Sequence, residues 1–357
     1  MDQPKTWISW PGAPLALGSA ALFGASTPFA KFLLGGGVSP WLLAGILYLG
    51  SGAGLTLFYV VRLMVGVASA EASLHRSDLP WLGLTILFGG VIGPVLLMLG
   101  LSMTAASSAA LLLNLEGIAT MVIAWVVFRE NVDRRILLGA AAILAGAMLL
   151  SWNGGPASVG WGALFIAGAC LSWGIDNNLT RKISHADPVQ IAAAKGLVAG
   201  TTNIILAIAV GAISPKFPLI AGAGAIGFLG YGVSLVLFVL ALRHLGSART
   251  GAYFSTAPFI GAVLAIVIFD EPVTVQLSAA AILMGIGLWL HLAERHEHKH
   301  IHMPQEHEHS HVHDEHHRHK HGPNDPSGEP HSHWHKHVSL THTHAHFPDL
   351  HHRHDHQ

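Results

Sequence analysis

The sequence predicts an all-α integral membrane protein with ten transmembrane helices, built as two inverted five-helix repeats and followed by a disordered histidine-rich tail. Three observations predict this fold. Of the 357 residues, 51% are hydrophobic and only 11% are charged, whereas charged residues make up about a quarter of a soluble domain. Long apolar runs recur along the chain to residue 293. Of the 27 histidines, only four precede residue 296. A soluble enzyme is excluded, and we expect no enzymatic activity.

Ten apolar runs are long enough to cross a bilayer, since a membrane helix needs about 20 mostly apolar residues. They cover residues 12–34, 40–62, 79–101, 105–128, 135–152, 159–180, 188–211, 219–242, 248–269 and 274–293. With the N-terminus in the cytoplasm, ten Lys and Arg residues fall at inside positions, and only Lys31 and Lys216 fall outside. By the positive-inside rule, both termini are expected in the cytoplasm.

The chain contains an internal repeat. Residues 128–132 (Phe-Arg-Glu-Asn-Val) are echoed by residues 269–273 (Phe-Asp-Glu-Pro-Val), and a helix rich in Gly and Ala follows each. Five spans in each half is an odd number, so the two halves must lie inverted in the membrane. The predicted domains are therefore 1–152, 153–293 and the tail 294–357. Inverted repeats are a transporter plan, with the substrate site near mid-membrane at the repeat interface.

These features resemble the drug/metabolite transporter superfamily, and in particular its EamA-type permeases. The resemblance covers residues 12–293. It is carried by the ten spans, the two Phe-x-Glu-x-Val elements, the Gly/Ala-rich final helices and the stretch from Trp173 to Arg181. It implies a proton-linked or facilitated carrier for small solutes, often an exporter, but not a particular substrate. The long histidine-rich tail is not part of the common family pattern.

Polar side chains within the spans are candidates for function, because they are costly in a bilayer. The candidates for substrate binding and proton coupling are Glu116, Asn114, Asp176, Asn177, Lys195, Tyr231 and Tyr253. Glu116 lies midway along span 4, where its carboxyl could couple protons to a substrate or bind a cation; the alternative is a structural hydrogen bond. Asp176 and Lys195 lie at similar depths, which predicts a pair that either functions or holds spans 6 and 7 together. Tyr231 and Tyr253 are candidate hydroxyls of the cavity, and the alternative is a role at the interface or in packing.

Five further residues carry structural expectations. Pro258 should free a backbone carbonyl in span 9, and Cys170, the only cysteine, is expected to be a small core residue that forms no intrachain disulfide. Lys31, near the outer end of span 1, is interpreted as a snorkelling interface residue. Glu271, like its counterpart Glu130, is expected to fix loop and helix-end geometry.

The tail after residue 294 cannot bury an apolar core, so we expect disorder. Its histidines recur at alternate positions, and neutral imidazole binds Zn, Cu, Ni and Co. The candidate metal ligands are His296, His298, His300, His302, His307, His309, His311, His313, His331, His333, His335 and His337. The binding is either physiological or the incidental chelation of a low-complexity tail.

The leading hypothesis is an EamA-type exporter in a bacterial inner membrane, with divalent Ni, Co or Zn ions as cargo gathered by the tail. The chief alternative is an exporter of small metabolites or amino acids with a metal-regulated or metal-buffering tail. Against metal cargo, the membrane part has one central carboxylate and no intramembrane His-Asp group. A membrane-anchored metal store or sensor is a third interpretation. The expected partners are the solute or ion and the bilayer, with no nucleic acid, and the protein is expected to be a monomer or homodimer.

Overall fold

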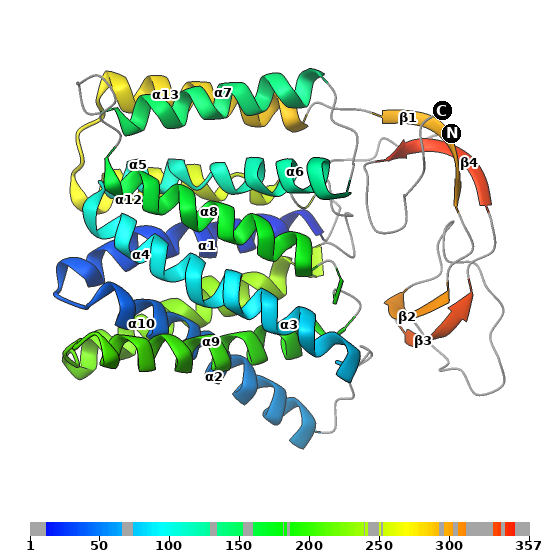
Figure 1. Ribbon diagram of the computed structural model, residues 1–357, viewed down its shortest axis with the longest axis horizontal. Coiled ribbons are helices and arrows are strands. Elements are labelled where there is room, and N and C mark those ends of the chain that lie inside the picture. Colours follow the sequence, from blue (N-terminus) through cyan, green and yellow to red (C-terminus); the bar gives the residue numbers. More distant parts are fainter. Residues whose placement is uncertain are drawn as a thin grey trace.

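A computed structural model of the chain describes residues 12–65, 74–128, 134–152, 160–180, 182–183, 186–238, 240–241, 250 and 253–292 of the membrane part. In the tail it describes residues 296–302, 306–311, 331–336 and 340–346. Throughout the described membrane part, the regular elements are helices (Figure 1). The prediction of a helical membrane part is therefore confirmed.

The helices of the first half follow the predicted runs. They are α1 (Gly12–Gly35), α2 (Pro40–Met64), the single turn η1 (Arg76–Asp78), α3 (Leu79–Thr85), the π-helix η2 (Ile86–Ile92), α4 (Gly93–Met103), α5 (Ala106–Leu112), α6 (Leu115–Phe128) and α7 (Arg134–Ser151). Proline stands in the first turn of several of them, as at Pro40, where its missing N–H has no intrahelical partner to lose.

The second half contains α8 (Trp161–Thr180), α9 (Pro188–Ala209), α10 (Phe217–Gly227), the π-helix η3 (Phe228–Val233), α12 (Ala257–Phe269) and α13 (Val275–Leu292). Among the described residues, 7 helices are long and apolar enough to cross a membrane. They are Gly12–Gly35, Pro40–Met64, Arg76–Met103, Ala106–Val127, Arg134–Ser151, Pro188–Ala209 and Phe217–Phe238. The chain is a multi-pass membrane protein.

Helices from the two halves pack in pairs. Helix α2 lies along α9, and α7 lies along α13 at one edge of the bundle (Figure 1). Where α2 crosses α9, Gly52 faces Gly196 so closely that a Cβ on either residue would overlap the backbone of the other helix. A Cβ on Gly146 of α7 would come within 3.0 Å of the carbonyl oxygen of Ala280. Small residues permit close packing in membranes, where apolar burial no longer drives helix association.

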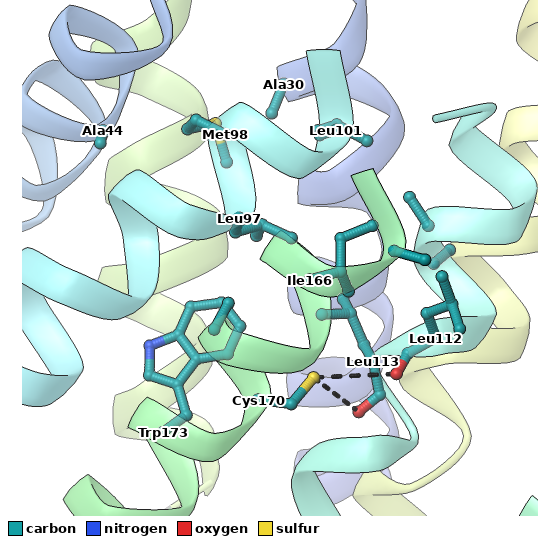
Figure 2. Packing of buried hydrophobic residues seen from close by; sticks show 14 of the residues in the cluster. Ala30, Ala44, Leu97, Met98, Leu101, Leu112, Leu113, Ile166, Cys170 and Trp173 are labelled. Carbon is teal, nitrogen blue, oxygen red and sulfur yellow. Dashed lines mark hydrogen bonds between the residues drawn. The ribbon is translucent and has the colours of Figure 1, made fainter. Parts of the chain in front are cut away.

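Two spans are interrupted at mid-length. Helix α5 ends at Leu112, and α6 starts at Leu115 after a turn. In the second half, a turn at residues 255–256 precedes α12, at the predicted proline site. Interrupted backbone within a membrane must be satisfied by protein. At the first break, the thiol of Cys170 donates to the carbonyl oxygens of Leu112 (3.7 Å) and Leu113 (4.0 Å), as Figure 2 shows.

Cys170 thus lies in the core, as predicted, with 1% of its surface exposed. Around it, side chains from α4, α5 and α8 form the central packing of the bundle (Figure 2). Leu97, Leu112 and Ile166 are at most 1% exposed there. The core therefore surrounds the break between α5 and α6 and holds it in place.

Lys31 has partners that the sequence did not indicate. Its Nζ donates to the carbonyl oxygens of Leu101 (2.6 Å), Ser102 (3.4 Å) and Thr104 (2.9 Å) at the end of α4. The four carbonyls at a helix C-terminus lack intrahelical partners and attract a cation. Sequence position alone could not reveal this, because the acceptors lie some 70 residues further along the chain.

In the tail, β1 (His296–His302) pairs antiparallel with β4 (Leu340–His346), and β2 (Glu306–His311) pairs antiparallel with β3 (His331–Lys336). The expected disorder of the tail stays a prediction. The alternation of His with other residues has the period of a strand, and paired backbones satisfy each other's polar groups without an apolar core.

Candidate functional site

The predicted pair between Asp176 on α8 and Lys195 on α9 is present. Lys195 Nζ donates to Asp176 Oδ2, and the two side chains are 14% and 9% exposed for Lys195 and Asp176, respectively. Thr180, one turn further along α8, donates from Oγ1 to Asp176 Oδ1 at 3.2 Å. A charge inside a membrane protein needs a partner because of the cost of losing water. The pairing explains how Lys195 is tolerated within an apolar helix.

The π-helix η2 packs directly on this pair. A Cβ on Gly89 would overlap Asp176 Oδ2 and would lie 2.5 Å from Lys195 Nζ, so a larger residue there would have to displace the pair. The carbonyl oxygen of Gly89 accepts two hydrogen bonds, from the hydroxyl of Tyr48 at 2.6 Å and from Trp173 Nε1 at 3.0 Å. The pair is therefore enclosed by backbone and by two aromatic side chains.

Side chains also bond the carbonyls on either side of Gly89. Ser172 Oγ donates to the carbonyl oxygen of Phe88 at 2.9 Å, and Asn203 Nδ2 donates to that of Gly90 at 2.9 Å. A π-helix is rare and is often found at functional sites. Here its carbonyls are held by residues of α2, α8 and α9, which fixes η2 against the charged pair.

A second polar contact joins Glu116 of α6 to Asn177 of α8. Asn177 Nδ2 donates to Glu116 Oε1 at 2.9 Å and to Thr120 Oγ1 at 3.2 Å. Glu116 lies in the first turn of α6, where the helix dipole favours a carboxylate. Asn177 is exposed and Glu116 is partly exposed, whereas the neighbouring Asn178 is buried. The carboxyl of Glu116 can therefore change its hydrogen-bond partner without unpacking the core.

The two contacts belong to one site. Asp176 and Asn177, which bond to Lys195 and Glu116 respectively, are consecutive residues of α8. A further aromatic side chain lies next to Tyr48: the ring centroid of Tyr231 is 5.4 Å from that of Tyr48. The candidate site therefore contains the Asp176–Lys195 pair, Glu116 with Asn177, and the bonded carbonyls of η2.

Of the seven candidates, four come together directly and Tyr231 joins them through Tyr48. Asn114 does not join them: it donates from Nδ2 to the carbonyl oxygen of Leu111 at 2.8 Å and lies 3.9 Å from Met284 Sδ. Tyr253 accepts at its carbonyl oxygen from Thr256 Oγ1 at 2.6 Å, beside the break before α12. These two residues stabilise interrupted backbone.

Sequence reasoning missed Tyr48, Gly89 and Asn203, and used Trp173 only as a motif residue. Two signals were available. Asn203 is a polar residue in the middle of an apolar span, and Gly89 and Gly90 form a consecutive glycine pair within another span. Nothing in the sequence indicated that these glycines lie in a π-helix, since its geometry depends on side chains from three other helices.

Metal-ligating residues do not gather in the described part of the membrane domain. Among the described residues, no group of three or more His, Cys, Asp or Glu side chains could hold a metal ion. In the tail, His296, His298 and His300 lie opposite other histidines in the β1–β4 register. His307, His309 and His311 do the same in β2–β3, whereas His302 lies opposite Leu340. His313 and His337 lie outside the described residues.

Comparison with known proteins agrees with the fold. The model of the EamA-like transporter family matches residues 10–152 and 160–293. An uncharacterized transporter of Methanothermobacter thermautotrophicus is 28% identical over 279 residues, covering 73% of this chain and 80% of that protein. The uncharacterized transporter YyaM of Bacillus subtilis is 20% identical over 228 residues, covering 61% of this chain and 74% of its own length.

A solved crystal structure shares the fold. It superposes with a TM-score of 0.59 at 19% sequence identity and covers 79% of this chain and 96% of its own. The family match extends over most of the chain and includes every helix that forms the candidate site. The chain therefore belongs to the EamA-like transporter family of the drug/metabolite transporter superfamily.

Proposed function

We propose that the protein is a secondary transporter that exports small zwitterionic metabolites, such as amino acids, across a bacterial inner membrane. The observation that carries the substrate class is the Asp176–Lys195 ion pair beside the partly exposed carboxyl of Glu116. In this proposal the protein has ten spans in two inverted repeats, with both termini in the cytoplasm.

Several features support the inverted repeat. The family model matches two successive segments of similar length. The interrupted spans end at corresponding residues, Phe128 and Phe269, which are 141 positions apart. The π-helices η2 and η3 end at Ile92 and Val233, also 141 positions apart. A helix break and a π-helix thus each recur after 141 positions, as expected when the same five-helix unit occurs twice.

The charges favour a zwitterion over a metal ion. An amino acid carries a carboxylate that can bond to Lys195 and an ammonium that can bond to Asp176 or Glu116. When the amino acid binds, the Asp176–Lys195 pair is replaced by two ion pairs between the protein and the solute. Every charge therefore keeps a partner, which matters because an unpaired charge is costly inside a membrane protein. A divalent cation would meet the positive charge of Lys195. In this account Glu116 also exchanges a proton as the solute binds and leaves.

Divalent metal export remains a second candidate, favoured by the tail. In β1–β4, six histidines occupy alternate positions on paired strands: His296, His298 and His300, opposite His346, His344 and His342. Imidazole suits Ni, Co and Zn as a ligand, and it recurs along both of these paired strands. The tail would gather ions for export or, with a metabolite as cargo, would buffer metal or regulate the carrier. A metal store or sensor without transport is the third interpretation.

Transport of zwitterions is tested by counterflow. Proteoliposomes preloaded with a mixture of unlabelled L-amino acids are diluted into the same mixture carrying radiolabel. The proposal predicts accumulation of label by the wild type, and in Glu116→Gln either no accumulation or accumulation that no longer depends on pH. Accumulation no greater than in empty liposomes would contradict this substrate class.

Metal export is tested in cells lacking their own exporters. Retention of Ni, Co and Zn is compared among the full chain, a chain ending at Arg295 and Glu116→Gln. Equal retention in all three and in cells without the protein would exclude metal cargo. If removing the tail changes retention but Glu116→Gln does not, storage by the tail is favoured.

A further inference from the structure

Lys31 and Glu271 hold the two sides of the junction between α4 and α5. Lys31 Nζ, from α1, donates to three carbonyls at the end of α4. The carboxylate of Glu271 accepts from the backbone N–H of Ala106 (2.7 Å, at Oε1) and of Ser107 (3.0 Å, at Oε2), at the start of α5. A cation thus meets the negative end of one helix and an anion meets the positive end of the next. We name these two side chains the clamp.

The motif at residues 269–273 explains how Glu271 reaches α5. Helix α12 ends at Phe269, and Asp270 follows with a φ of 50°, the left-handed conformation that terminates helices. Asp tolerates this conformation better than most residues other than glycine. The backbone N–H of Glu271 then bonds back to the carbonyl oxygen of Ile266 at 3.2 Å. The expected role of Glu271 in helix-end geometry is confirmed, although the helix that it caps is α5.

The clamp links segments of both halves. Lys31 and the α4–α5 junction belong to the first half, whereas Glu271 follows α12 in the second. The charges of Lys31 and Glu271 also attract each other. In carriers built from inverted repeats, access alternates by movement of one repeat or bundle against the other. A contact that joins the halves at one membrane surface must therefore break when that surface opens.

Helix α5, which begins at the clamp, is buried. The six buried residues of α5, Ala106, Ser107, Ala109, Ala110, Leu111 and Leu112, are each at most 1% exposed. In α6, the continuation of the same span, Ile118 and Ala124 are both 7% exposed, while Gly117 and Trp125 are exposed. The end of the span that carries the clamp is thus buried inside the protein.

We infer that Lys31 and Glu271 form the outer gate of the carrier, and that the structure is the state in which this gate is shut. The inference rests on the proposed transport function and on the proposed cytoplasmic termini, which place the α4–α5 junction at the outer surface. Opening frees the N–H groups of α5 and the carbonyls of α4 to bond to water.

The gate is tested by labelling a cysteine beneath it. The single native cysteine is replaced (Cys170→Ser), and Ser107→Cys introduces a reporter at a position that is 1% exposed. Intact cells are treated with a membrane-impermeant thiol reagent, and labelling is normalised to the protein present in the membrane. We expect Lys31→Met and Glu271→Ala each to speed labelling about tenfold, because losing bonds to a charged group shifts a two-state equilibrium by that order.

Matched controls separate gating from loss of charge. Lys216→Met removes an exposed lysine from the same side, and Asp270→Asn removes the neighbouring exposed acid while suiting the left-handed turn. Both should label at the rate of the reporter alone. Glu271→Gln, which keeps one acceptor oxygen, should label at an intermediate rate and replaces Glu271→Ala if the latter does not reach the membrane.

Two results would overturn the gate: unchanged labelling in Lys31→Met and in the Glu271 variants, or faster labelling only when the reagent reaches the cytoplasmic side in inverted vesicles. A merely structural role predicts lower yield or thermal stability, with no effect confined to one side. The assay needs no substrate, so its failure is distinguishable from a failed search for cargo in the counterflow assay.

Discussion

Two regions of the molecule each contain a lysine and a carboxylate, and they use them differently. In the clamp, Lys31 and Glu271 bond to backbone groups at helix ends. In the candidate site, Lys195 and Asp176 bond to each other. A charge held by backbone cannot be released without freeing a helix end, whereas a side-chain pair can be exchanged for a solute. The difference separates residues suited to gating from residues suited to binding.

The largest effect is expected from removing one member of the site pair. Lys195→Met or Asp176→Asn leaves a buried charge without its partner, which costs roughly 3–5 kcal/mol when a buried pair is broken. The double variant Asp176→Asn/Lys195→Met removes both charges and should recover most of the melting temperature measured in detergent. A double variant no more stable than either single variant would show that the pair does not act as a unit.

A methyl group at Gly89 should disrupt the same pair by steric overlap. Gly89→Ala would push Asp176 and Lys195 apart, and overpacking of this kind costs about 1–3 kcal/mol. Gly117→Ala is the matched control, because a Cβ there meets no atom within 4 Å. Thermal unfolding of the two variants checks the prediction, and equal melting temperatures would contradict the close packing of η2 on the pair.

Smaller effects are expected from the hydrogen bonds to the carbonyl of Gly89. Tyr48→Phe and Trp173→Phe each remove one of its two donors, so each should cost about 1 kcal/mol. Their double variant leaves that carbonyl with neither donor, so its loss should exceed the sum of the single losses. Strict additivity in thermal unfolding would indicate that the two donors act independently.

Glu116→Gln should change stability least. Gln keeps an oxygen that accepts from Asn177 Nδ2, so the contact between α6 and α8 persists. It cannot ionise, so transport should be lost, or should no longer depend on pH. Counterflow measured over a range of pH values checks this, and a wild-type pH profile in Glu116→Gln would exclude Glu116 as the proton-coupling residue.

The sequence predicted those features that depend on composition and on short spacing. Apolar runs located the helices, and the similar depths of Asp176 and Lys195 predicted their pairing. Features that depend on contacts between distant segments could not be predicted from the sequence. The carbonyls that Lys31 binds belong to α4, so local sequence did not indicate these contacts. The π-helix beneath the pair depends on donors from α2, α8 and α9.

The tail shows the same limit. Composition indicated disorder and metal ligands, and the alternating histidines were read as separate short units. The structure pairs β1 with β4, which brings His342, His344 and His346 opposite histidines 42 to 50 positions earlier. Strand register between such distant segments cannot be read from composition, and the metal ligands stay a prediction.

Binding of the solute by the Asp176–Lys195 pair is tested by counterflow in the double variant Asp176→Asn/Lys195→Met. Proteoliposomes are preloaded with unlabelled L-amino acids and challenged with the labelled mixture, and the melting temperature is measured on the same preparation. We expect the double variant to be folded and to accumulate no more label than empty liposomes, whereas the wild type accumulates label. Wild-type accumulation by the folded double variant would contradict the claim.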